Sequence, residues 1–144
     1  MARLRLVRHG RAAAGWNVDP DPALDQLGQR QANDVAAALR AFGPLPILSS
    51  PLRRCQETSH PLATAWGVDV VVEPRVAEIP SPEDHTLETR IDWLRQAMAG
   101  TWSQVIASDG SRYADYRTNL LSALSSVEGD AVVFSHFIAI NVVI

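Results

Sequence analysis

Lysine is absent from the 144-residue sequence, and all 13 basic residues are arginines. The formal net charge is −3, and no basic run is longer than the pair Arg53-Arg54, so the chain has little with which to neutralise a nucleic-acid backbone. We therefore expect no nucleic-acid partner. Arginine has a planar guanidinium that matches phosphate oxygens, so a phosphorylated ligand remains a possible partner.

Cysteine and long apolar stretches are also scarce. Cys55 is the only cysteine, which excludes an internal disulfide and fits a reducing, cytoplasmic location. No apolar stretch approaches the roughly 20 residues that span a bilayer, and the N-terminus lacks the apolar core of a signal peptide, so no membrane partner is expected. Apolar residues make up 47% of the chain, which predicts one packed domain over residues 1–144.

Short β-branched runs alternate with amphipathic stretches along the chain. Strands are expected at residues 3–7, 46–49, 68–72 and 130–135, and helices at residues 26–42, 51–66, 87–98, 113–127 and from 137 onward. The alternation favours an α/β fold: a three-layer sandwich whose mostly parallel sheet has helices on both faces. The nearly continuous β-branched run at 68–72 is typical of a strand that is covered on both faces.

Basic and histidine side chains follow three of the predicted strands at the point where each strand ends. Arg8-His9-Gly10 follows the first strand, Arg53 comes shortly after the second, and His136 follows the last. The carboxyl ends of parallel strands share one edge of a sheet, and ligands bind at that edge in open α/β folds. We therefore expect these residues to converge on one crevice.

These residue types suit phosphoryl transfer, which needs a nucleophile, positive charge around the phosphoryl oxygens and an acid for the leaving group. A neutral His9 can attack through one ring nitrogen while the other donates to a nearby carbonyl. Arg8, Arg53 and His136 can hold the phosphoryl group. Glu78 can supply the proton, provided that burial or the phosphate charge keeps it protonated. Such a site needs neither a metal nor a cofactor.

Five segments occur in a characteristic order: Leu6-Val7-Arg8-His9-Gly10, Leu24–Ala32, Ser49–Thr58, Val76–Ile79 and Val133–His136. Together they resemble the signature of the histidine phosphatase superfamily, also called the phosphoglycerate mutase-like family. The resemblance implies a phosphohistidine on His9, with a phosphate pocket made by Arg8, Arg53 and His136. It also implies Glu78 as the proton donor, a mixed and mostly parallel sheet, and Asn17 as a further phosphate contact.

Two features depart from the family pattern. Pro80-Ser81-Pro82 replaces the glycine and aromatic residues that often follow the acid. This replacement changes the wall of the pocket, so the family pattern does not identify the substrate. The sequence also ends eight residues after His136, where the family usually continues with a helix and at least one more strand. We therefore expect either a shortened member of the family or a fragment of a longer chain, without these C-terminal elements. Exposed apolar surface would then invite pairing in a homodimer.

Other side chains that can carry chemistry are interpreted as structural. Arg54 is expected to face solvent beside Arg53, and Cys55 is expected to pack in the core. His60 and His85 are expected at the surface.

The expected activity is hydrolysis of a small phosphorylated substrate, or of a phosphoprotein, through phospho-His9. Two alternatives stay open: a mutase that returns the phosphoryl group to its substrate, and a module that binds phosphorylated ligands without catalysis. The acid also has alternatives, because Glu73, Glu83 and Asp84 lie close to Glu78 in the sequence.

Overall fold

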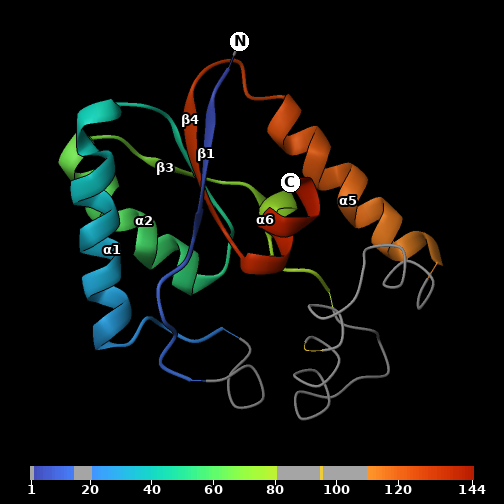
Figure 1. Cartoon of the computed structure of the whole chain (residues 1–144), viewed down its shortest axis with the longest axis horizontal. Helices are drawn as coiled ribbons and strands as arrows, with labels where there is room; N and C mark the ends of the chain where they lie inside the picture. The colour runs from blue at the N-terminus through green and yellow to red at the C-terminus, as the bar shows by residue number, and fades with distance from the viewer. Residues whose placement is uncertain (1, 15–20, 81–94, 96–109) are drawn as a thin grey trace.

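Four parallel strands form the sheet of the computed structural model, which describes residues 2–14, 21–80, 95 and 110–144. They are β1 (Leu4–Arg8), β2 (Ile47–Ser49), β3 (Val70–Val72) and β4 (Ala131–Ser135), in the spatial order β1-β4-β2-β3. The described helices are α1 (Gln26–Leu39), α2 (Arg53–Trp66), α5 (Gly110–Ser125) and α6 (Phe137–Val143), with 3-10 turns η1 (Arg40–Phe42) and η2 (Pro74–Val76). Helices α1 and α2 cover one face of the sheet, and α5 and α6 cover the other (Figure 1). The predicted three-layer α/β fold is confirmed.

Alternating side chains on the central strand β4 divide the core into two halves. Val132 and Phe134 pack with residues of α1 and α2, whereas Val133 between them packs with residues of α5 and α6. This alternation is the period of two expected for a strand. Strand β4 is therefore buried on both faces, as its apolar run predicts.

The prediction for residues 68–72 is wrong in one respect. Strand β3 lies at the edge of the sheet, and Val71 and Val72 are 58% and 44% exposed rather than covered on both faces. A run of valines indicates a strand but not its place in the sheet, because β-propensity depends on the neighbours a strand acquires. The predicted helix at 87–98 lies outside the described residues, apart from Arg95.

The turn that follows β1 packs tightly on the start of α1. The side chain of Asp25 caps α1 by accepting a hydrogen bond from the backbone N–H of Gly28 at 2.7 Å, and it pairs with Arg11. A Cβ added to Gly28 would lie 2.2 Å from the carbonyl oxygen of Arg11, and one added to Gly10 would lie 2.6 Å from that of Gly28. This close backbone contact fixes the segment that carries His9.

Gly28→Ala is therefore expected to destabilise the protein by about 1–3 kcal/mol, because the backbone would have to move to admit the new methyl group. Gly129→Ala is the matched control, since a Cβ at Gly129 meets nothing within 4 Å. Urea denaturation, followed by circular dichroism, should show a lower midpoint for Gly28→Ala only. Equal midpoints for the two variants would contradict the close packing described here.

Among the described helices, none has both the length and the apolar character that a membrane crossing requires.

Candidate active site

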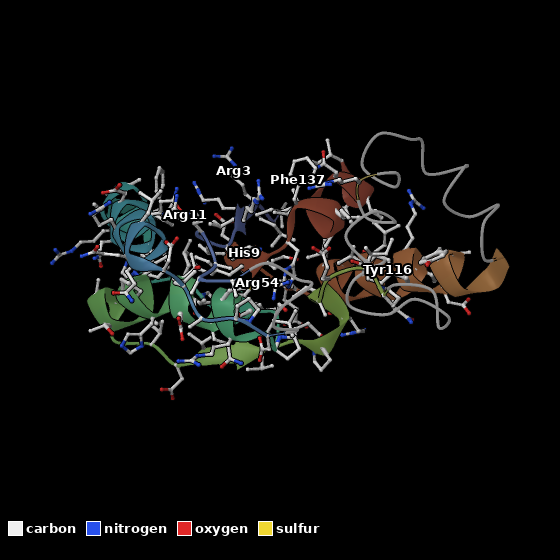
Figure 2. The ribbon with its side chains drawn as sticks, turned by 90° about the horizontal axis from the view of Figure 1, so that it is seen from below. Arg3, His9, Arg11, Arg54, Tyr116 and Phe137 are labelled. Carbon is white, nitrogen blue, oxygen red and sulfur yellow. The ribbon has the colours of Figure 1, made fainter. Side chains whose placement is uncertain are left out.

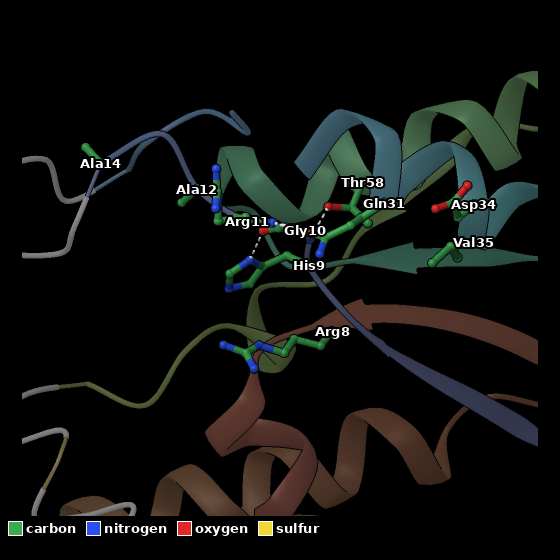
Figure 3. Close-up of a pocket in the computed structure, with 10 residues that line it drawn as sticks. All are labelled: Arg8, His9, Gly10, Arg11, Ala12, Ala14, Gln31, Asp34, Val35 and Thr58. Carbon is green, nitrogen blue, oxygen red and sulfur yellow. Dashed lines mark hydrogen bonds between the residues drawn. The ribbon is translucent and has the colours of Figure 1, made fainter. Parts of the chain in front are cut away.

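His9 lies immediately after β1, and its backbone N–H continues the ladder to β4 by bonding to the Ser135 carbonyl at 3.1 Å. Its ring Nδ1 is 2.7 Å from the carbonyl oxygen of Gly10 (Figure 3). Because a carbonyl oxygen only accepts, Nδ1 must carry the proton, and the lone pair of the neutral ring is on Nε2. Burial lowers the pKa of His9 to about 4, and the charges of Arg54 and Arg8 act in the same direction. The ring is therefore neutral near pH 7, with Nε2 available as a nucleophile.

A buried guanidinium that contacts His9 belongs to Arg54, so the prediction that Arg54 faces solvent is wrong. Arg54 is fully buried, and its Nε donates to His9 Nε2 at 3.2 Å (Figure 2). Arg53, which the sequence placed in the phosphate pocket, is not brought to His9. Its side chain is 62% exposed and pairs with Glu57 at 2.6 Å.

Helix geometry explains why Arg54 is buried beside His9 while its neighbour Arg53 is exposed. Helix α2 begins at Arg53, and successive residues of an α-helix are rotated by about 100° around its axis. One of two adjacent arginines can therefore point at the sheet edge while the other points to solvent. The local sequence gives both residues the same chemistry and does not specify the rotation of the helix.

His136 lies after β4, and its fully buried ring completes the cluster. The ring is 5.2 Å from that of His9 between centroids, at an interplanar angle of 65°. Its Nδ1 is 3.3 Å from the Nη2 of Arg54, and its Nε2 is 2.8 Å from the Oγ of Ser50. Since a guanidinium only donates, Nδ1 accepts, and the neutral ring donates its Nε2 proton to Ser50. Arg54 therefore links the two histidines.

Glu78 is the acidic residue that the described structure brings to this cluster. It is 8% exposed, and its Oε2 is 3.8 Å from His136 Nδ1. Its Oε1 accepts a hydrogen bond from the Ile79 N–H at 3.0 Å. Glu73 instead pairs with Arg75 at 2.7 Å, and residues 83 and 84 lie outside the described residues. The structure thus favours Glu78 over Glu73 as the acid of the cluster.

Arg8 is the last residue of β1, and its side chain extends beside that of His9 (Figure 3). Its guanidinium carbon is 5.2 Å from the centroid of the Phe137 ring. A hollow of about 700 Å³ adjoins both residues and continues along α1 to Asp34 and Val35. Positive charge therefore faces a space that is open to a ligand.

Two hydroxyl groups in the cluster were not predicted as site residues. Thr58 Oγ1 accepts from the Gly10 N–H at 2.9 Å and donates to the Arg54 carbonyl at 2.6 Å, which ties the His9 turn to α2. Ser50 orients His136, as described above. Both belong to the segment Ser49–Thr58 that carried the family resemblance, which was the available signal.

Cys55 is fully buried, as predicted, and its Sγ lies 3.4 Å from His136 Nε2. Burial raises the pKa of this thiol to about 12, so the group stays protonated and packs beneath the cluster rather than acting as a nucleophile. His60 is exposed, as predicted, whereas residues 17 and 85 fall outside the described residues. Within the described part of the chain, no three His, Cys, Asp or Glu side chains gather in a way that could hold a metal ion.

Curated relatives share much of the chain. It is 34% identical over 113 residues to "Probable phosphoglycerate mutase GpmB" of Cronobacter sakazakii, a match that covers 70% of the chain and 52% of that protein. The protein of the same name from Yersinia enterocolitica is 31% identical over 138 residues, covering 88% of the chain and 63% of that protein. The chain therefore spans between half and two thirds of the length of these relatives.

Solved structures give the same fold. A structure titled "Mycobacterial hydrolase 1" is 25% identical with a TM-score of 0.65, covering 98% of the chain and 78% of that protein. Bacillus stearothermophilus YhfR is 21% identical with a TM-score of 0.75, covering 96% of the chain and 76% of that protein. A mycobacterial glucosyl-3-phosphoglycerate phosphatase is 24% identical with a TM-score of 0.70, covering 99% and 77%. The latter two likenesses concern the fold alone.

The sequence itself matches one family model, the histidine phosphatase superfamily (branch 1), over residues 4–144. The curated relatives are named as mutases and the family is named for phosphatases, so this family membership leaves the choice between the two activities open. With a model match over nearly its whole length, the chain belongs to the histidine phosphatase superfamily.

Proposed function

We propose that the protein hydrolyses phosphomonoesters through a phosphohistidine intermediate on His9. One observation carries the proposal: the Gly10 carbonyl fixes the proton of His9 on Nδ1, so the lone pair of Nε2 faces the guanidinium of Arg54. The nucleophilic nitrogen therefore lies next to the guanidinium that would hold the phosphoryl group it attacks.

In the first step, the phosphoryl group of the substrate replaces the hydrogen bond between Arg54 and His9. Its charged oxygens are stronger acceptors for a guanidinium than an imidazole nitrogen is. His9 Nε2 attacks phosphorus, the N–P bond forms as the ester P–O bond breaks, and protonated Glu78 gives its proton to the leaving oxygen. Arg8 and Arg54 bind the phosphoryl oxygens, His136 joins them by giving one of these oxygens the N–H that it now donates to Ser50, and together they stabilise the charge that the oxygens carry in the transition state.

In the second step, water displaces His9 from phosphorus. The Glu78 carboxylate takes a proton from this water as its oxygen attacks, the N–P bond breaks, and inorganic phosphate leaves. His9 returns to its neutral form and Glu78 to its protonated form, so the cycle closes without a further reagent. This use of one carboxyl as acid and then as base requires that it stay beside the reacting phosphorus.

Trapping the intermediate tests the proposal. A substrate with a radiolabelled phosphoryl group is mixed with the protein and quenched in alkaline denaturant within milliseconds to seconds. We expect protein-bound label that survives alkali and is released by acid, because the N–P bond of phosphohistidine is acid-labile. Release of inorganic phosphate with no labelled protein at any time, or with label that survives acid, would overturn the phosphohistidine route.

Phosphoryl transfer of the mutase type is the second candidate, because the curated relatives named above are called probable phosphoglycerate mutases. It shares the first step and differs in the acceptor of the second. The same labelled experiment separates the two activities, because a phosphatase transfers the label to water and a mutase returns it to a hydroxyl of the substrate. We favour hydrolysis, and predominant recovery of label in an isomeric phosphate ester would favour the mutase instead.

A further inference from the structure

The loop that carries Glu78 is held by two hydroxyl groups from different elements. Ser135 Oγ, at the end of β4, donates to the Val76 carbonyl at 2.6 Å. The Tyr116 hydroxyl, on α5, donates to the Ala77 carbonyl at 2.8 Å. These are the last two carbonyl groups before Glu78, so both hydrogen bonds act directly on the segment that sets its position.

The hydrogen bond from the Tyr116 hydroxyl to the Ala77 carbonyl ties this loop to α5. The helix also packs on η2, and its Leu120 and Ala123 belong to the same apolar core cluster as Val76 of η2. Apolar contacts are not directional, whereas a hydrogen bond to a particular carbonyl fixes the orientation of one peptide group. The hydroxyl therefore adds what the apolar packing lacks.

The Tyr116 hydroxyl is suited to act as a constant donor. Burial raises its pKa above the ordinary value, and the charge of Glu78 raises it further. It stays protonated through the neutral range, so its hydrogen bond to Ala77 does not depend on pH.

We propose that Tyr116 is a positioning residue for the acid: its hydroxyl fixes the Ala77 carbonyl and thereby holds the Glu78 carboxyl beside His136. The proposal rests on the proposed function, because a proton donor matters only if an ester oxygen leaves. It assigns α5, which supplies none of the proposed phosphate ligands, a part in catalysis through the backbone of the acid loop.

A misplaced acid has a characteristic kinetic effect. An alkyl phosphate has a strongly basic leaving oxygen and depends on the proton from Glu78, whereas a nitrophenyl phosphate departs readily without one. Loss of the positioning bond should therefore selectively slow the transfer of the phosphoryl group from alkyl phosphates to His9. A general loss of folding or of phosphate binding would slow both kinds of substrate equally.

The experiment compares Tyr116→Phe with wild type on a series of alkyl and aryl phosphates. We expect kcat/KM, which reports the steps up to phosphorylation of His9, to fall about tenfold for alkyl phosphates and to change by less than about twofold for nitrophenyl phosphate. The comparison uses kcat/KM because Glu78 also acts as the base in hydrolysis of phospho-His9, a step that all substrates share and that can limit kcat. Ser126→Ala is the matched control, because it also removes a hydroxyl that donates to a backbone carbonyl, that of Ala123 at 2.7 Å, at the far end of α5. The control should behave as wild type.

A double-mutant cycle with Glu78→Gln ties the effect to the acid. In the Glu78→Gln background, Tyr116→Phe should no longer change the ratio of kcat/KM for alkyl phosphates to kcat/KM for aryl phosphates. Equal losses of kcat/KM on both substrate types, no loss on either, or an undiminished effect in the Glu78→Gln background would overturn the positioning role.

If Tyr116→Phe fails to fold, Ser135→Ala provides the same readout, because it removes the neighbouring anchor of the loop. An unaltered ratio of kcat/KM for alkyl to aryl phosphates in Ser135→Ala would likewise overturn the positioning role. A wild-type protein that releases no phosphate from any substrate would instead overturn the proposed function itself.

Discussion

Arg54→Ala is expected to lower kcat/KM for phosphomonoesters by about a hundred- to a thousandfold, whereas Arg53→Ala should change it by less than about threefold. The two residues are neighbours on α2 and have the same chemistry, but only Arg54 contacts His9, at 3.2 Å, and His136, at 3.3 Å. The exposed pair of Arg53 with Glu57 has no such contact with the histidines, and exposed ion pairs contribute little to stability. Steady-state phosphate release by the two variants measures the difference.

Arg54→Lys sharpens this comparison. Lysine keeps the positive charge but cannot place two fixed donors on two different histidines, so we expect it to recover only a small part of the lost activity. Because Arg54 is fully buried, thermal melting of each variant is needed to show that the loss is not a loss of folding. A loss for Arg53→Ala as large as for Arg54→Ala would contradict the placement of the site.

The two arginines also show where prediction from the sequence stops. The sequence specified that a helix after the second strand would carry a basic residue to the sheet edge, because strand order and turn residues are local signals. It did not specify which of Arg53 and Arg54 turns inward, because that depends on how α2 rests on β2 and β4, and the apolar residues of α2 decide this together with their partners. The chemistry was predictable, and the rotation of the helix was not.

The same limit applies to the acid and to β3. Glu78 could be predicted as a candidate acid from its order in the chain. The choice between Glu78 and Glu73 became possible only when the structure showed that Glu73 pairs with Arg75. The anchors of its loop, Ser135 and Tyr116, come from elements far along the chain, and no local pattern marks them. Similarly, the valines of β3 indicate a strand without indicating an edge. What the sequence left open in each case was a tertiary contact.

His9→Ala is expected to lower phosphate release by about ten-thousandfold or more and to eliminate the acid-labile phosphoprotein. The reason is the loss of the single atom that forms the N–P bond, His9 Nε2, which the Gly10 carbonyl holds in its nucleophilic form. His60→Ala is the control, since His60 is an exposed histidine on the same α2 helix that carries Arg54, and it should retain full activity. Full turnover by His9→Ala would exclude His9 as the nucleophile.

Two further measurements on His9→Ala separate catalysis from binding. Arg8, Arg54 and His136 remain in the variant, so its affinity for inorganic phosphate, measured by calorimetry, should stay within about tenfold of wild type. Free imidazole should restore part of the activity, because its nitrogen can enter the space left by the ring and attack the phosphorus held there. A protein that binds phosphate equally well with and without His9, and hydrolyses nothing in either form, would be a phosphate-binding module. Rescue by imidazole would instead require that the remaining side chains hold phosphorus in line for a nucleophile at the position of His9 Nε2, which a site built only for binding has no reason to provide.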